Sequence, residues 1–186
     1  MLRAGGLVAF PTDTLYGVAA DPRSDAAVAK LFGIKGRAAG NAIPLIAADR
    51  AQAMAAGEFG EREQRLAETF WPGPLSIVVR ARPGLSRGVM GGDGTIALRV
   101  PAQNVARALA RAFGFCVTAT SANLSGATAA ASADRVVDML PALDLLLDSG
   151  PAPGGPPSTI VAFDEGGPVL VRAGAVAWDR VLKLVR

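Results

Sequence analysis

The densest group of reactive side chains directly follows the first apolar run of the chain. Residues 6–10 are typical of a short buried strand, which we expect to end at the next proline, because proline cannot donate to a sheet ladder. Thr12, Asp13, Thr14 and Tyr16 then place hydroxyls, a carboxylate and a phenol at the strand end, where α/β proteins bind ligands. The alternative is a turn in which Thr12 and Asp13 hydrogen-bond their own backbone.

Several cations stand far apart along the chain. Lys35 and Arg37 flank a glycine at the end of a predicted helix, an arrangement that also suits a helix C-cap without any ligand. Arg99 interrupts an apolar strand, so its side chain either reaches solvent at a rim or points into a cleft. Arg172 ends another apolar strand, and a polar loop at 120–126 follows a third. If the strands bring these groups together, the resulting cationic cleft suits phosphates and carboxylates, with catalysis by positioning and charge stabilisation.

The amino-acid composition limits the chemistry available to such a cleft. The 186 residues include no histidine, which excludes Ser-His-Asp and Cys-His catalysis and the common zinc sites. The single cysteine, Cys116, lies in an apolar stretch and is expected in the core. Nineteen Lys and Arg against 16 Asp and Glu give a net charge of +3, which suits an anionic small ligand as readily as nucleic acid. Neither a P-loop nor a Gly-x-Gly-x-x-Gly turn is present, so a nucleotide would be held in another way.

Helical and strand-like segments alternate along the chain. Helices are predicted over residues 25–34, 50–56, 61–70, 103–113, 133–139 and 178–185. Strands are predicted over residues 6–10, 43–47, 75–80, 96–100, 115–119 and 143–147, followed by a hairpin of 158–163 and 169–172. This order predicts one α/β domain with a mixed sheet. The glycine- and proline-rich segments 84–94 and 151–157 are alternative candidates for a loop that closes over the site.

The hydrophobic runs are short. None approaches the roughly 18 residues of a membrane span, and we expect no signal peptide before the first strand. These patterns predict a cytoplasmic protein with no membrane partner, formed by a single domain over residues 1–186.

Seven short motifs stand in the order found in the YrdC/Sua5/TsaC family, and the chain resembles that family over about residues 2–176. The motifs are Pro11-Thr12-Asp13-Thr14-Leu15-Tyr16-Gly17, Lys35-Gly36-Arg37, Trp71-Pro72-Gly73-Pro74-Leu75-Ser76, Arg99-Val100-Pro101, Ser121-Ala122-Asn123-Leu124-Ser125-Gly126, Ser158-Thr159-Ile160 and Arg172-Ala173-Gly174. The resemblance implies the short, single-domain TsaC-like form, without a C-terminal Sua5 domain. It also implies a twisted, open mixed sheet flanked by helices, with a positively charged concave groove.

The activity that this resemblance implies is that of an L-threonylcarbamoyladenylate synthase. Such an enzyme condenses L-threonine, bicarbonate and ATP into threonylcarbamoyl-AMP and pyrophosphate, for t6A formation at position 37 of tRNA. Mg²⁺ is implied as the companion of ATP, and no metal site on the protein is expected. The implied partners are the downstream t6A transfer machinery and weakly bound RNA, and the implied state is a monomer or a weak dimer.

The resemblance assigns roles to residues at matching positions. The residues expected to bind threonine or the carbamate are Thr12, Tyr16, Arg37, Arg99 and Ser158. The residues expected to bind the nucleotide are Lys35, Ser121, Asn123 and Arg172. Lys35 and Arg37 are the expected catalytic residues, because cations can neutralise the charge that develops on the phosphates and the carbamate.

Two positions depart from the family's pattern. Asn41 and Ala42 stand where the family usually has a Lys-Pro pair, and Gln103 stands where it often has histidine. The loss of a lysine that meets phosphates costs on the order of 1–3 kcal/mol. Two alternatives therefore stay open, namely a YrdC-like RNA-binding protein without this activity and a divergent paralogue that acts on another carbamoyl-adenylate. The scarcity of aromatic residues argues against a stacking platform for single-stranded RNA.

Overall fold

The computed structural model describes residues 1–36 and 42–185, which contain six α-helices, two short 3-10 helices and eleven strands. The helices are η1 (Leu2–Ala4), α1 (Asp25–Lys35), α2 (Arg50–Ala56), α3 (Glu61–Phe70), η2 (Arg87–Val89), α4 (Asn104–Phe113), α5 (Ala133–Met139) and α6 (Trp178–Val185). The strands are β1 (Val8–Pro11), β2 (Tyr16–Ala19), β3 (Leu45–Ile46), β4 (Gly57–Glu58), β5 (Leu75–Ala81), β6 (Thr95–Arg99), β7 (Val117–Thr118), β8 (Thr120–Ser121), β9 (Leu145–Leu146), β10 (Thr159–Asp164) and β11 (Gly167–Arg172). The predicted α/β class and all six predicted α-helices are confirmed.

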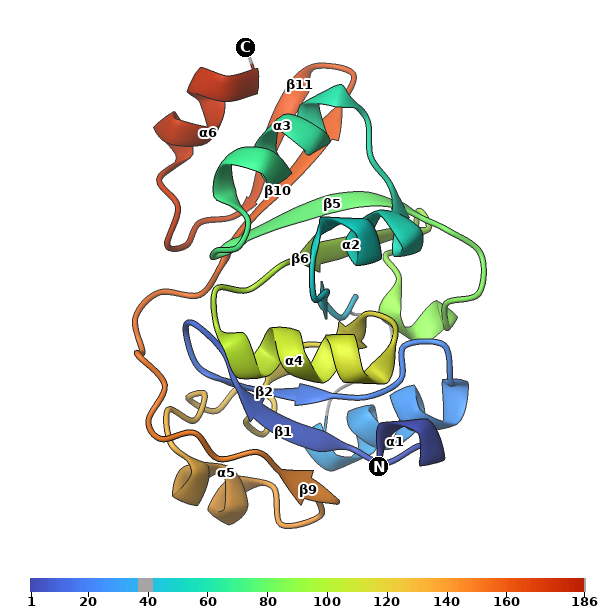
Figure 1. Ribbon diagram of the computed structural model, residues 1–186, viewed down its shortest axis with the longest axis vertical. Helices are drawn as coiled ribbons and strands as arrows, with labels where there is room; N and C mark the ends of the chain where they lie inside the picture. Colours follow the sequence, from blue (N-terminus) through green and yellow to red (C-terminus); the bar gives the residue numbers. More distant parts are fainter. Residues whose placement is uncertain (37–41, 186) are drawn as a thin grey trace.

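The strands divide between two mixed sheets. One sheet has four strands in the order β8-β2-β1-β9, and the other has seven, with the path β11-β10-β5-β6-β3-β7 and β4 paired to β5. The sequence predicted one mixed sheet, whereas β1 pairs only with β2 and β9 and does not join the longer path. In Figure 1 the four-stranded sheet lies in the lower half of the molecule, and β5, β10 and β11 lie in the upper half. Residues that both sheets contribute therefore meet between them.

The first two strands form a hairpin that the sequence analysis missed in part. β1 runs through Pro11, which pairs with Tyr16, and β2 returns antiparallel to it across a four-residue loop. The prediction assigned Tyr16 and Gly17 to a polar loop, but both residues belong to β2 and are buried. A side chain at Gly17 would come within 3.3 Å of the Phe10 ring and 3.4 Å of the Thr120 carbonyl, so glycine here permits close approach of β8. The polar loop is therefore shorter than predicted and is held at both ends by strands.

Helix ends follow local capping chemistry. The Ser24 side chain accepts a hydrogen bond from Ala27 N at 3.2 Å and caps α1. At the other end of α1, Gly36 adopts a left-handed conformation with φ 57°, which confirms the C-cap interpretation of that glycine. Gln103 Oε1 accepts from Val105 N at 3.1 Å and caps α4, so the residue that departs from the family's pattern has a structural role.

The core is built mainly of aliphatic residues and contains Cys116, as predicted. Burial raises the pKa of the Cys116 thiol to about 12. In the part of the chain that the structure describes, no helix combines the length and the hydrophobicity needed to cross a membrane.

A long connection without helix or strand joins the two sheets. It runs from β9 to β10 over residues 147–158 and passes along the left side of the view in Figure 1. Ala152 N donates to Ala131 O at 2.8 Å, and Gly154 N donates to Thr14 O at 2.8 Å. The other candidate for a closing loop, 84–94, contains η2 and is tied by a hydrogen bond from Ser86 N to Pro22 O. Both candidate loops are thus anchored by backbone hydrogen bonds.

Candidate active site

A pocket of about 280 Å³ lies between the two sheets, at the lower end of the size range of small-molecule sites. The four-stranded sheet contributes the loop between β1 and β2 together with β8, and the seven-stranded sheet contributes the ends of β3, β6, β10 and β11. The residues predicted as site residues that line this pocket are Thr12, Tyr16, Arg99, Ser121, Ser158 and Arg172. Of the two candidate closing loops, only 151–157 contributes to the lining, through Pro157. The fold therefore brings together residues up to 160 positions apart in the sequence.

The loop between β1 and β2 is built around the Thr12 side chain. Thr12 Oγ1 donates to Leu15 O at 2.6 Å and accepts from Thr14 N and Leu15 N, each at 3.2 Å. Thr14 Oγ1 lies 3.1 Å from the same oxygen. The backbone-turn alternative is therefore correct for Thr12, whose hydroxyl is engaged within its own loop. Thr14 lines the pocket as well, and its hydroxyl has Thr12 as its side-chain partner.

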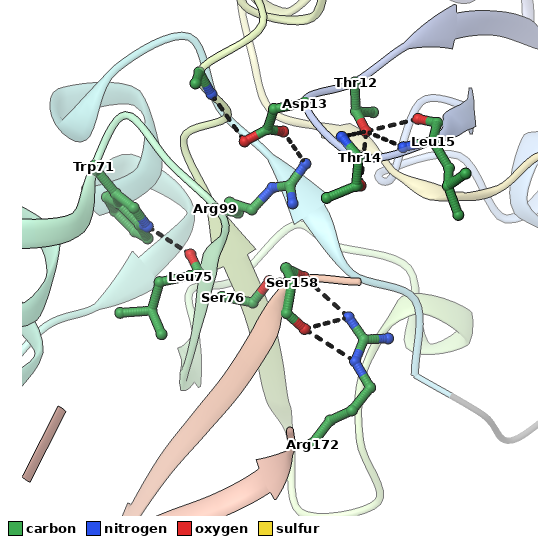
Figure 2. A network of polar contacts seen from close by, with 11 residues as sticks. Thr12, Asp13, Thr14, Leu15, Trp71, Leu75, Ser76, Arg99, Ser158 and Arg172 are labelled. Carbon is green, nitrogen blue, oxygen red and sulfur yellow. Dashed lines mark hydrogen bonds and ion pairs between the residues drawn. The ribbon is translucent and has the colours of Figure 1, made fainter. Parts of the chain in front are cut away.

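Arg99 points into the pocket and is held there by Asp13. The distance from Arg99 Nη2 to Asp13 Oδ1 is 2.7 Å, and the two side chains are only 7% and 13% exposed. Asp13 Oδ2 also accepts from Ala102 N at 3.3 Å, so the carboxylate bridges the guanidinium and the backbone just beyond β6 (Figure 2). Of the two interpretations of Arg99, the cleft is the correct one.

The electrostatics of Arg99 have three identifiable sources. Burial lowers the pKa of the guanidinium, the Asp13 carboxylate opposes that shift, and the charge of Arg172 lowers the pKa further. Among the described residues, two guanidinium groups therefore face one pocket, and one carboxylate partly compensates them. An anionic ligand would relieve both the burial and the mutual repulsion.

The second cation is fixed by Ser158, the residue just before β10. Arg172 Nε and Nη2 donate to Ser158 O at 3.1 and 2.7 Å, and Nη2 also donates to Ser158 Oγ at 2.9 Å. Ser158 Oγ lies 3.1 Å from Ser76 Oγ, a buried hydroxyl on β5 (Figure 2). Burial lowers the pKa of Arg172. Ser76 on β5, Ser158 just before β10 and Arg172 on β11 thus form one polar chain along the pocket wall.

Lys35 lies behind the pocket and not in its lining. Lys35 Nζ donates to Ser121 O, to Asn123 O at 2.8 Å and to Asn123 Oδ1 at 3.2 Å, and the residue is 3% exposed. Asn123 Nδ2 in turn donates to Ala127 O at 2.5 Å, and Ser121 Oγ donates to Asn123 Oδ1 at 2.5 Å. A phosphate contact by Lys35 would require one of its three N–H groups to leave this loop. The predicted nucleotide contacts of Lys35, Ser121 and Asn123 stay predictions.

Tyr16 lines the pocket but turns its hydroxyl away. The phenol donates to Gly150 O at 2.7 Å and lies 3.2 Å from Asp148 Oδ1, at the start of the connection between the sheets. Burial, more than the Asp148 contact, raises the pKa of this phenol. Tyr16 therefore acts on the pocket through its ring and by anchoring the chain near Gly150.

Two of the predicted positions lie outside the described residues, and three residues had no assigned role. Arg37, predicted to be catalytic, and Asn41 are not described. Asp13, the partner of Arg99, and Thr14, in the lining, were named only as part of the polar loop, and the hydroxyl of Ser76 in the lining was not singled out. Asp13 and Thr14 lie inside the first motif, so their residue types were the available signal. Within residues 1–36 and 42–185 no group of three or more His, Cys, Asp or Glu could hold a metal ion.

The fold and the site define an α/β protein with two mixed sheets and, between them, a pocket lined by the guanidinium groups of Arg99 and Arg172. Residues 1–174 match the Sua5/YciO/YrdC family, whose description is "Telomere recombination", and the chain belongs to this family.

Particular relatives extend this assignment. The threonylcarbamoyl-AMP synthase of Pyrococcus abyssi (strain GE5 / Orsay) is 36% identical over 186 residues, which are 99% of this chain and 55% of that protein. The threonylcarbamoyl-AMP synthase of Idiomarina loihiensis is 35% identical over 160 residues, which are 84% of this chain and 86% of that protein. The crystal structure of P. abyssi Sua5 complexed with L-threonine superposes with a TM-score of 0.92 at 34% identity, covering all of this chain and 56% of that one. The chain spans about half the length of the P. abyssi proteins that it matches.

Proposed function

We propose that this chain is an L-threonylcarbamoyladenylate synthase that condenses L-threonine, bicarbonate and ATP into threonylcarbamoyl-AMP and pyrophosphate. The observation that carries the proposal is the convergence of Arg99 and Arg172 in one pocket lined with hydroxyls. The relatives named above as threonylcarbamoyl-AMP synthases, and the L-threonine bound to P. abyssi Sua5, support it.

The proposal gives the two arginines different substrates. Arg99 lies beside the loop of Thr12 and Thr14, so we assign it the carboxylate of threonine, with the Thr14 hydroxyl available to the amino acid. Arg172 lies beside Ser158, at the end of β11 in the same seven-stranded sheet as Arg99, and we assign it the phosphates of ATP. Ser121 lines the pocket on β8 and completes the nucleotide side. Two cations that each bind a different substrate suit a reaction that joins two anionic substrates.

The chemistry requires no covalent enzyme intermediate. The amine of threonine attacks the carbon of bicarbonate or CO₂ and forms a carbamate, with water as the product when bicarbonate reacts. A carbamate oxygen then attacks the α-phosphorus of ATP, and the bond to the departing pyrophosphate breaks. Fixed cations lower the energy of both steps because negative charge accumulates on the carbamate and phosphate oxygens. The absence of histidine from the sequence is compatible with this scheme.

Mg²⁺ belongs to the proposal as part of the ATP substrate. Asp13 is the carboxylate nearest to Arg99, and it is already paired with that guanidinium. The described residues thus offer no carboxylate cluster as a protein-held metal site, and we assign Mg²⁺ to the phosphates alone. The product would pass to machinery that transfers the threonylcarbamoyl group to tRNA.

The test is to mix the chain with L-threonine, bicarbonate, ATP and Mg²⁺ and to measure pyrophosphate release, with the nucleotide product identified by mass. We expect release that stops when threonine or bicarbonate is omitted. L-Serine and other amines in place of threonine test for a divergent paralogue. Salt-dependent RNA affinity in a folded chain without threonine-dependent pyrophosphate would overturn the proposal in favour of an RNA-binding protein.

A further inference from the structure

Asp13 is a carboxylate at the pocket edge to which neither the motif analysis nor the proposed reaction gives a role. It lies in the loop between β1 and β2 of the four-stranded sheet, whereas its partner Arg99 ends β6 of the seven-stranded sheet. Their 2.7 Å contact therefore joins the two walls of the pocket. An ion pair at this place fixes the width of the pocket as well as the direction of one cation.

The loop around Asp13 is rigid enough to aim its carboxylate. Thr12 Oγ1 forms four hydrogen bonds with Leu15 and Thr14, and Thr12 N donates to Leu15 O at 3.1 Å. These bonds fix the backbone on both sides of Asp13. The second carboxylate oxygen accepts from Ala102 N, so both oxygens are engaged and the side chain has one orientation.

The contact with Asp13 uses only part of the Arg99 guanidinium. Asp13 meets Nη2, and among the described residues the Arg99 guanidinium makes no other hydrogen bond or ion pair. A guanidinium carries five N–H donors in a planar fork, so its other N–H groups are left for a ligand in the pocket. Fixing the fork before a ligand arrives lowers the entropy lost when a carboxylate binds.

We infer that Asp13 is a positioning residue that holds the Arg99 guanidinium in the orientation that receives the carboxylate of the amino-acid substrate. This inference rests on the proposed function. Asp13 acts through Arg99 and does not itself contact the amino acid, since its oxygens are engaged by Arg99 and Ala102.

The test is steady-state kinetics of Asp13→Asn, with the KM for L-threonine and the KM for ATP measured separately. Asparagine keeps the shape of the side chain but removes its charge. We expect the KM for L-threonine to rise about 10- to 100-fold, with kcat and the KM for ATP within about threefold of the wild-type values. Asp144→Asn is the matched control, because Asp144 also bridges a cation and a backbone N–H, those of Lys30 and Leu7, but neither partner lines the pocket as Arg99 does. It is expected to lower the melting temperature without changing the KM for threonine.

A double-mutant cycle separates positioning from a general effect on the fold. If Asp13 acts only through Arg99, adding Asp13→Asn to Arg99→Ala will raise the KM for L-threonine no further. Additive effects in the cycle, or a KM for threonine unchanged in Asp13→Asn, would overturn the inference. If Asp13→Asn fails to fold, Asp13→Glu replaces it, because it moves the charge by one methylene. We expect about a 3- to 10-fold higher KM for threonine in that variant, and an unchanged KM overturns the inference.

The same experiment distinguishes this inference from the proposed function. A wild-type chain that folds but releases no threonine-dependent pyrophosphate overturns both. An active wild type in which Asp13→Asn matches Asp144→Asn overturns the positioning role alone.

Discussion

The replacement Lys35→Met tests how the lysine behind the pocket contributes. Lys35 is 3% exposed, and its Nζ donates to Ser121 O, Asn123 O and Asn123 Oδ1. Methionine fills much of the space of the aliphatic stem but leaves these three oxygens without their charged donor. Because these oxygens lie in a loop that borders the pocket, the loss affects both folding and the position of Ser121.

The size of the effect follows from the contacts. A hydrogen bond to a charged group contributes about 1.5–3 kcal/mol, and the recovered hydration of a buried ammonium offsets part of the sum. We expect the free energy of unfolding to fall by about 2–4 kcal/mol. With a urea m-value of about 2 kcal/mol/M, the unfolding midpoint shifts down by about 1–2 M.

Lys30→Met is the matched control on the same helix. The Lys30 side chain is 41% exposed and forms an ion pair with Asp144 at 2.6 Å. An exposed pair contributes about 0–1 kcal/mol, so the midpoint is expected to move by less than about 0.5 M. Urea unfolding followed by tryptophan fluorescence measures both variants. Equal shifts in the two variants, or a Lys35→Met midpoint within error of the wild type, would refute the argument from buried hydrogen bonds.

Three further predictions use the same proposed enzyme and its fold. Arg99→Ala is expected to raise the KM for L-threonine by about 100-fold or more in a chain that still melts cooperatively; a chain that melts early with an unchanged KM would show a structural role instead. Gly174→Ala is expected to lower the free energy of unfolding, measured in urea, by about 3 kcal/mol, because a Cβ there would lie 2.2 Å from Pro157 O and 2.5 Å from Thr159 N. The control Gly33→Ala has open space in α1 and is expected to raise the free energy of unfolding by up to about 1 kcal/mol. Similar effects in the two variants would contradict the clash. Burial raises the pKa of the Cys116 thiol from 9.0 to about 12, so as the pH rises this thiol ionises first in the unfolded chain. The contribution of Cys116 to the free energy of unfolding is therefore complete below pH 9 and declines as the pH rises towards 12. A native chain that reacts with a thiol reagent at pH 8 as fast as the unfolded chain would contradict this burial.

The sequence predicted the helices well because their signals are local. Ser24 caps α1 and Gly36 ends it, and both features are legible within a few residues of each helix end. The missed strand β2 has only four residues, and it follows the polar loop without a break in composition. Its strand character depends on pairing with β1 and β8, which the sequence does not express locally.

Motif order located most of the pocket, but the direction of each side chain depended on distant partners. The sequence allowed two positions for the Arg99 side chain, at a solvent-exposed rim or in a cleft. Only its contact with Asp13, 86 positions away, decided between them. Lys35 matched a ligand-binding motif, yet its ammonium group contacts Ser121 and Asn123, which lie far away in the second half of the sequence. Ser76 lies at the start of β5, where the side chains on both faces of the strand are buried. The strand therefore has no alternation of polar and apolar residues that could indicate the contact between the Ser76 and Ser158 hydroxyls.

The hairpin of β10 and β11 contributes Ile160 and Arg172 to the lining of the pocket, and it also protects β5. β10 covers the Leu75–Ile77 portion of β5, while β4 covers the portion at Arg80 and Ala81, so that edge of the long strand is occupied by two separate neighbours. Proteolysis within the exposed connection at 151–157, followed by loss of the hairpin, would strip β10 from an apolar strand and leave its backbone N–H and C=O groups open to another chain. Loss of this hairpin would thus remove part of the pocket lining and expose an edge of β5 at the same time, so we expect a variant that loosens it to precipitate.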